Sequence, residues 1–497
     1  MLASRVDDVA VILAKGLTVA VVAVAALGLT SCTAGGAPEP TNSGVDLNQH
    51  FAAFEVCDDL PAPYLCATIE VPLDRHDDGA GMIPLRIFGI PHADMSTPEG
   101  LPLFTTPGGP GAEGIDNHAL WQLPGLIGAN HDVVTIDPRG SGQSGAIDCP
   151  ELQGGSSTAA QFYLDSTACG QQLGPTSDLF GGPHRAMDIE AVREFMGYDR
   201  IIFHGDSYGG IDVQAYASRF PDRLAAAVID GGWVMDDIDM FFGTGYPASL
   251  MGVVDTACRA DAACAASTAD PSGTVSTVVA RLREAPVAED GTVVIDEASI
   301  ARLIRDAGAA VEVVAASLPF LTGDTTPMAN LVREHQAIGI PPGGEVEAFS
   351  AGANAAGWCN DQVFPFDVTA SQADRQSQLD DALAALDDDA FAPWSKEGWQ
   401  SLWLFGQCVG WPAPSQHEPV LVGDPSFPGI PALLLVGDQD PALASAATLE
   451  GRFPAGTTVV VPGAQHPSMS LGVCIAAFEA EFIETLEVPD TPPCGDH

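Results

Sequence analysis

Positive charge is scarce in this sequence. Only 19 of 497 residues are Lys or Arg, whereas 66 are Asp or Glu, and the formal net charge is −47. Lys15 and Lys396 are the only lysines. Such a chain would repel a polyanion and offers no basic stripe, so we expect no nucleic acid partner.

Motifs for metals and cofactors are also missing. The 11 cysteines include no C-x-x-C pair, and neither an H-E-x-x-H motif nor a P-loop occurs. Residues 140–145 match G-x-G-x-x-G, but the loop-like Asp148-Cys149-Pro150 follows where a dinucleotide site needs a helix. We therefore expect no metal and no organic cofactor.

The N-terminal region has the features of an export signal. Residues 16–29 form an uncharged apolar run that follows Arg5 and Lys15. Such a run is typical of a secretory signal and is short for a membrane span, which needs about 20 residues. It ends at Leu29-Thr30-Ser31-Cys32, which matches a bacterial lipobox. We expect residues 1–31 to be a lipoprotein signal peptide.

Lipidation at Cys32 would anchor the mature chain to the outside of the cell membrane. The alternative is an ordinary secreted protein in which Cys32 is incidental. Residues 32–50 are small and polar, which indicates a flexible tether. Oligomeric state leaves no signature in the sequence.

Ten cysteines remain after Cys32, and an exported protein meets an oxidising environment. We expect them to form disulfides, with neighbours in sequence as one candidate pairing. These disulfide candidates are Cys57, Cys66, Cys149, Cys169, Cys258, Cys264, Cys359, Cys408, Cys474 and Cys494.

Strand-like runs alternate with helical patterns in two parts of the chain. Expected strands are residues 67–73, 84–90, 101–105, 132–136, 200–204, 224–230, 431–436 and 457–461. Expected helices are residues 184–197, 211–220, 442–453 and 469–486. This order and the apolar runs predict an α/β fold with a mostly parallel sheet, covered by helices on both faces.

The middle of the chain has a different pattern. Residues 233–429 show no regular strand spacing, and helices are expected at residues 299–318 and 372–386 between Pro-rich joints. We interpret this segment as a mainly helical insertion. It separates a first core part, residues 51–232, from a C-terminal core part, residues 430–497.

A nucleophile motif lies between an expected strand and an expected helix. Gly205-Asp206-Ser207-Tyr208-Gly209 fits G-x-S-x-G. In this context the glycines permit the tight turn that exposes a serine hydroxyl. A plain β-turn is the alternative, but the position favours Ser207 as a nucleophile.

A serine nucleophile needs a base, and the base needs an acid to orient it. Asp438 and Asp440 follow the expected strand 431–436, and His466 follows the expected strand 457–461. We expect His466 to be the general base. The G-x-x-D spacing favours Asp440 as its partner, with Asp438 as the competing acid.

An oxyanion hole requires two backbone N–H donors. The first is expected from Tyr208, the residue after the nucleophile. The second is expected from the glycine loop Gly108-Gly109-Pro110-Gly111, with Gly109 as the donor because proline has no N–H.

Five motifs occur in order: PGGPG, DPRGSGQS, GDSYGG, GDQDP and PGAQH. With them the sequence resembles the α/β-hydrolase family of secreted tripeptidyl aminopeptidases and proline iminopeptidases, particularly the actinobacterial branch. The resemblance implies an α/β-hydrolase fold, a triad of Ser207, Asp440 and His466, and a lid over the active site that corresponds to the insertion.

The expected function is an exported serine hydrolase that releases short N-terminal peptides through an acyl-enzyme. A carboxylesterase or lipase acting on envelope or exogenous esters is the main alternative. A non-catalytic binding lipoprotein on the same fold is a further one. An exopeptidase must also bind the substrate ammonium, for which Glu113, Asp236, Asp237 and Asp361 are candidates.

Overall fold

The computed structural model describes residues 49–490 and Cys494, without residues 59, 95–99, 156–158, 236–244, 290–291, 306–307, 336–343, 403 and 416–417. The expected signal peptide and Cys32 lie outside the described residues, as do most of the expected tether, Asp236 and Asp237. Among the residues described, no helix has both the length and the apolar character required to cross a bilayer.

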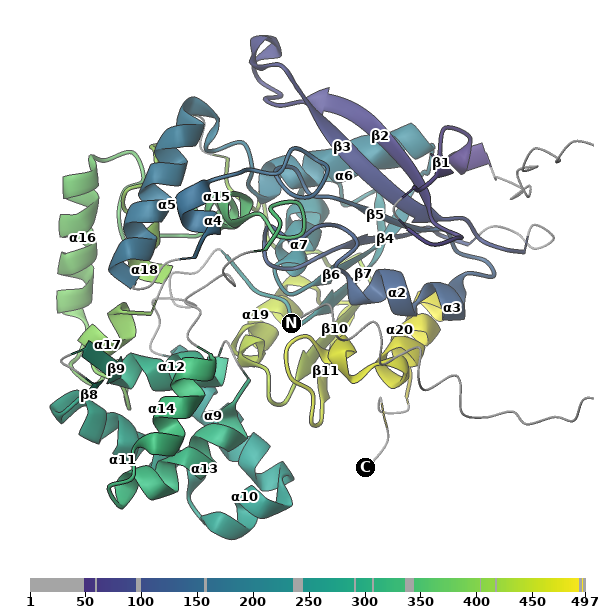
Figure 1. The fold of residues 1–497 in the computed structure, drawn as a ribbon. Helices are drawn as coiled ribbons and strands as arrows, with labels where there is room; N and C mark the ends of the chain where they lie inside the picture. The colour runs from purple at the N-terminus through teal and green to yellow at the C-terminus, as the bar shows by residue number, and fades with distance from the viewer. Residues whose placement is uncertain are drawn as a thin grey trace, which may run out of the picture. The chain divides into compact units, whose positions relative to one another are not determined.

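A nine-stranded sheet forms the centre of the described chain, in the order β1-β2-β3-β5-β4-β6-β7-β10-β11 (Figure 1). Its strands are β1 Glu55–Val56, β2 Leu65–Pro72, β3 Met82–Ile90, β4 Leu103–Thr106, β5 Val133–Ile136, β6 Ile201–Asp206, β7 Leu224–Asp230, β10 Ala432–Gly437 and β11 Gly456–Val461. All pairs from β5 to β11 are parallel, and the pairs from β1 to β5 through β2 and β3 are antiparallel. The predicted mostly parallel sheet is confirmed.

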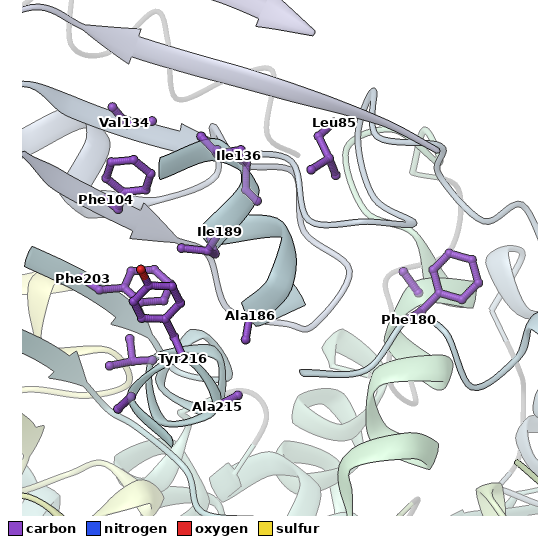
Figure 2. Packing of buried hydrophobic residues seen from close by; sticks show 14 of the residues in the cluster. Leu85, Phe104, Val134, Ile136, Phe180, Ala186, Ile189, Phe203, Ala215 and Tyr216 are labelled. Atoms are coloured by element: carbon purple, nitrogen blue, oxygen red, sulfur yellow. The ribbon is translucent and has the colours of Figure 1, made fainter. Parts of the chain in front are cut away.

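Successive strand residues point to opposite faces of the sheet, and apolar residues lie on both faces, so helices cover both. On β6, Phe203 belongs to the cluster that contains α6 and α7, whereas Ile202 belongs to the cluster that contains α2, α3 and α20. Figure 2 shows Phe104 and Phe203 of the sheet on the same side as Ile189 of α6 and Tyr216 of α7. The described helices of the two core parts are α2 His118–Gln122, α3 Pro124–Ile127, α4 Pro150–Gln153, α5 Ala159–Leu173, α6 Gly182–Met196, α7 Gly209–Arg219, α19 Ala446–Arg452 and α20 Val473–Thr485.

The chain between β7 and β10 contributes a second, separate hydrophobic cluster built mainly from helices. The described helices between β7 and β10 are α9 Gly245–Ala260, α10 Ala262–Ser267, α11 Pro271–Glu284, α12 Glu297–Arg305, α13 Ala310–Leu321, α14 Thr326–Glu334, α15 Ala351–Asp361, α16 Gln372–Ala385, α17 Lys396–Gln400 and α18 Leu404–Gln407. A short antiparallel hairpin, β8 Val287–Glu289 with β9 Thr292–Ile295, interrupts the helices. Helices α9 to α14 gather into one bundle in Figure 1.

One expected helix is wrong. The pattern over residues 299–318 predicts a single helix, but the structure has α12 and then α13, with Gly308 between them at φ +60°. A positive φ lies outside the right-handed helical region, so one continuous helix cannot pass through Gly308. The periodicity continues across the break because both helices bury their apolar faces in the same cluster.

The helices between residues 233 and 429 do not all belong to one hydrophobic cluster. Unlike α9 to α14, helix α15 places Ala353, Ala356 and Cys359 in the cluster of the central sheet. The expected lid role of this segment stays a prediction.

Five disulfides join the ten cysteines, each to its neighbour in sequence. They are Cys57–Cys66, Cys149–Cys169, Cys258–Cys264, Cys359–Cys408 and Cys474–Cys494. Their Cα separations lie between 5.1 and 5.4 Å, within the usual range for a bonded pair. The bond Cys359–Cys408 ties α15 to the chain beyond α18.

Candidate active site

Ser207 occupies a sharp turn between β6 and α7. Its φ is +55°, a left-handed conformation that is rare for a residue with a side chain. Glycines make the turn possible, because a Cβ on Gly205 would collide with the Gly209 carbonyl and one on Gly209 would lie 2.7 Å from the Thr106 oxygen. The Ser207 N–H donates to the Asp230 carbonyl at 2.8 Å, which fixes the turn against β7.

The structure brings Ser207, His466 and Asp440 together. His466 Nε2 lies 2.7 Å from Ser207 Oγ, and His466 Nδ1 lies 2.9 and 3.0 Å from the two Asp440 carboxylate oxygens. Asp440 follows β10 and is fully buried, and His466 follows β11. The geometry fits an imidazole that donates from Nδ1 to Asp440 and accepts the Ser207 proton at Nε2.

The competing acid Asp438 has a different partner. Its Oδ1 accepts the Gly463 N–H at 2.8 Å and so holds the turn that precedes His466. Asp440 also accepts the Ala442 N–H at 2.7 Å, which fixes its carboxylate at the start of the following turn.

The protonation of His466 is governed by two opposing effects. Burial has the largest single effect and lowers the pKa of the imidazole, but the nearby carboxylates, Asp440 before Asp230 and Asp206, together raise the pKa above the ordinary 6.5. A buried carboxylate that favours imidazolium is the environment in which a histidine can accept a proton from serine.

Gly231 is a site residue that the sequence reasoning missed. It directly follows β7 at φ +61°, and a Cβ there would lie 2.8 Å from His466 Nδ1 and 2.9 Å from Asp440 Oδ2. The space for the His466–Asp440 pair therefore exists because residue 231 has no side chain. The available signal was the Gly231-Gly232 pair at the end of a buried strand.

The glycine loop after β4 lies against Ser207. A Cβ on Gly108 would be 2.8 Å from Ser207 Cβ and 3.3 Å from Ser207 Oγ, so this backbone approaches the hydroxyl closely. Gly109 follows at φ +113°. Tyr208 precedes the first residue of α7, where backbone N–H groups lack helical acceptors.

The Tyr208 side chain turns away from solvent and ends in a buried polar network. Its hydroxyl donates to Asp361 Oδ2, which also accepts from Arg185 Nη2 at 2.9 Å. Arg185 Nε in turn donates to Asp212 Oδ1 at 2.7 Å. Asp361 is only 3% exposed and ion-paired, so it does not offer a free carboxylate to a substrate ammonium. Glu113 is partly exposed, and its role as a ligand of the substrate ammonium stays a prediction.

A second group of buried ionisable residues lies behind His466. Asp230 accepts the Ser468 and Met469 N–H groups at 2.9 and 2.8 Å and so holds the backbone just after His466. His204 Nε2 lies 3.2 Å from Glu479 and 3.7 Å from Asp206. Burial lowers the pKa of His204, but these carboxylates raise it to about 9, whereas burial raises the pKa of Asp230 to about 7.

The loop that matches G-x-G-x-x-G has a structural role. Asp137 accepts the N–H groups of Gly114 and Gln143 at 2.7 and 2.6 Å, and Arg139 pairs with the buried Asp188 at 2.7 Å. The next helix, α4, has only four residues and starts at Pro150. This is a braced turn rather than the strand–loop–helix of a dinucleotide site.

The chain is similar in sequence to known hydrolases and peptidases. Residues 102–274 match the family described as alpha/beta hydrolase fold, and residues 396–494 match the family described as TAP-like protein. The chain is 27% identical to the tripeptidyl aminopeptidase of Streptomyces coelicolor over 191 residues, 34% of this chain and 35% of that protein. It is 28% identical to the serine protease Hip1 of Mycobacterium tuberculosis over 192 residues, 35% of this chain and 36% of that protein. The matches thus span about a third of the length of these curated relatives.

The solved structure of the proline iminopeptidase of Mycobacterium smegmatis aligns with this chain at 15% sequence identity and a TM-score of 0.39. The alignment covers 84% of this chain and 98% of the iminopeptidase chain.

Proposed function

We propose that this chain, in which residues 102–274 match the alpha/beta hydrolase fold family and residues 396–494 match the TAP-like protein family, is a serine hydrolase that acts through Ser207, His466 and Asp440. The observation that carries the proposal is the relay of hydrogen bonds from Ser207 Oγ through both ring nitrogens of His466 to the buried Asp440. No other described serine lies at the strand-to-helix turn that this chemistry requires.

The reaction is a two-step acyl transfer. His466 takes the Ser207 proton as the oxygen attacks a carbonyl carbon, and the Tyr208 and Gly109 N–H groups stabilise the oxyanion. His466 then protonates the leaving amine or alcohol, and an acyl-enzyme remains on Ser207. Water, deprotonated by His466, attacks the acyl group and releases the acid, while Asp440 holds the imidazole tautomer throughout.

The proposed substrate is the N-terminal part of a peptide, from which short peptides are released. Relatives named tripeptidyl aminopeptidase and serine protease support a peptide substrate. The net charge of −47 is compatible with a substrate that has a cationic amino terminus.

We also propose that the enzyme acts outside the cell, as a membrane lipoprotein anchored at Cys32 or as a secreted protein. Five disulfides support an oxidising compartment. Mass spectrometry of the mature N-terminus tests this proposal: a diacylated Cys32 supports the anchor, and an uncleaved Met1 contradicts export by this signal.

The catalytic proposal is tested by labelling with a fluorophosphonate probe. Wild-type enzyme is expected to label and Ser207→Ala is expected not to, while the circular dichroism spectra of both stay the same. Ser218, whose hydroxyl donates to the Ala215 carbonyl and accepts from Arg219 and the Val422 N–H, provides the matched Ser→Ala control. Undiminished labelling of Ser207→Ala would contradict the assignment.

Substrate class is tested by kinetics on three compounds: a tripeptide anilide with a free amine, its N-blocked form, and a p-nitrophenyl ester. An exopeptidase requires the free amine. Equal rates on the free and blocked anilides, with a much faster ester, would instead indicate a carboxylesterase.

A further inference from the structure

We infer that helix α15, which lies far from the nucleophile in sequence, positions the oxyanion hole, with Asn354 and Asp361 as positioning residues. The inference rests on the proposed function. It concerns the Tyr208 and Gly109 N–H groups, which must be held at fixed positions relative to a developing negative charge.

Hydrogen bonds tie the glycine loop to the start of α15. Asn354 Nδ2 donates to the Pro110 carbonyl at 2.8 Å, and the Ser350 N–H donates to the Gly111 carbonyl at 2.8 Å. Ala112 pairs with Phe349 in an antiparallel bridge. The residues that directly follow Gly109 are thus fixed by a partner about 240 positions later in the chain.

Two glycines allow this close approach. A Cβ on Gly111 would collide with the Ser350 carbonyl, and one on Gly357 of α15 would lie 2.5 Å from Pro110 Cγ and 3.2 Å from the Tyr208 hydroxyl. The loop and the helix therefore pack closely at both glycines. Little space remains in which Gly109 could shift.

The second donor is connected to the same helix. Tyr208 donates its hydroxyl to Asp361 at the end of α15, and the Trp358 ring stacks edge-on against the tyrosine ring at 5.1 Å between centroids. Asp361 also accepts the Gly182 N–H at 2.9 Å, so the carboxylate is held from several directions. Helix α15 thus contacts Tyr208 itself and Pro110, the residue after Gly109.

α15 offers a matched pair of asparagines for a test. Asn354 Nδ2 bonds the Pro110 carbonyl at 2.8 Å, and Asn360 Nδ2 bonds the Ser177 carbonyl at 2.7 Å, away from the glycine loop. Both side chains are partly buried and make an equivalent bond. Loss of either costs α15 a similar contact, but only Asn354 is linked to the oxyanion hole.

The experiment compares Asn354→Ala and Asn354→Asp with Asn360→Ala. Asn354→Asp keeps the size of the side chain and removes the donor, so it serves if the alanine variant folds poorly. Measured are kcat and KM on a hydrolysed ester or anilide, the melting temperature, and the affinity for an alkyl boronic acid, whose adduct on Ser207 is tetrahedral.

Both Asn354 variants are expected to lose about 10- to 100-fold in kcat with little change in KM, and boronate affinity is expected to fall in parallel. Asn360→Ala is expected to keep kcat and boronate affinity. Unchanged kcat in the Asn354 variants, or an equal loss in Asn360→Ala, would overturn the inference. A wild-type enzyme that neither labels at Ser207 nor turns over any substrate would instead overturn the proposed function, and this inference with it.

Discussion

The two sides of Ser207 are built in different ways. On the base side, Asp440, His466 and Gly231 all lie within a few residues of the end of a sheet strand, and the buried Asp230 fixes the next backbone turn. On the oxyanion side, the glycine loop depends on α15, from the segment between β7 and β10. Parallel strands place their ends at one edge of the sheet, so sheet topology brings the base-side residues together. The oxyanion side also requires α15, from the segment between β7 and β10, to pack against the glycine loop.

The strongest expected effect tests the base side. Asp440→Asn is expected to lower kcat by about 10⁴-fold, because the amide favours the wrong imidazole tautomer. Asp438→Asn is the control, since Asp438 bonds Gly463 rather than His466. Steady-state kinetics measure both, and a larger loss for Asp438→Asn would reverse the assignment of the acid.

Gly231→Ala is the next largest test of the base side. The new Cβ would contact His466 Nδ1 and Asp440 Oδ2 at a backbone position that already has φ +61°. A displacement of the imidazole is expected to lower kcat about 100-fold. Gly463→Ala is a matched control, because its φ is +74° but no atom lies within 4 Å of the added Cβ. Equal kinetic losses in the two variants would show that backbone strain, rather than contact with the pair, is responsible.

Disulfides allow the oxyanion side to be loosened selectively. Removal of Cys359–Cys408 by a double Cys→Ala change opens a loop of 49 residues and is expected to cost about 4 kcal/mol of unfolding free energy, with a fall in kcat as α15 loosens.

The control is the double Cys→Ala change at Cys258–Cys264, which are 6 residues apart and lie in the hydrophobic cluster of helices α9 to α14. This change is expected to cost about 2 kcal/mol of unfolding free energy and to leave kcat unchanged. Denaturant unfolding and kinetics measure both. Equal kinetic losses would indicate that general destabilisation, rather than α15, affects the site.

The smallest expected effect concerns the buried charges behind His466. The pKa of His204 is raised to about 9, so the folded state binds a proton that the unfolded chain releases near pH 6.5. The stability from this group is complete below about pH 6.5 and is lost as the pH rises to about 9. Asp230, with its pKa raised to about 7, adds a decline in the same direction at lower pH.

Melting temperatures between pH 6 and 9 check this expectation. The wild-type value should fall as the pH rises, and His204→Gln should flatten the slope. A melting temperature that rises over this range would contradict the charge assignment of the His204–Glu479 pair.

The sequence by itself determined the sheet, the order of its strands along the chain, and the positions of Ser207, Asp440 and His466 after three of those strands. These features are local: apolar runs end at glycine-containing turns, and parallel strands gather their ends at one edge. Pairing of sequence neighbours also anticipated the five disulfides, four of which join cysteines at most 20 residues apart.

Only the tertiary structure decided what surrounds these residues. The free space at Gly231 depends on two side chains more than 200 residues away, and the approach of α15 to Pro110 depends on the packing of α15 in the cluster of the central sheet. The break at Gly308 lies within one continuous apolar pattern. Each of these features arises from contacts between distant segments, and a periodic pattern in one segment contains no information about its distant partner.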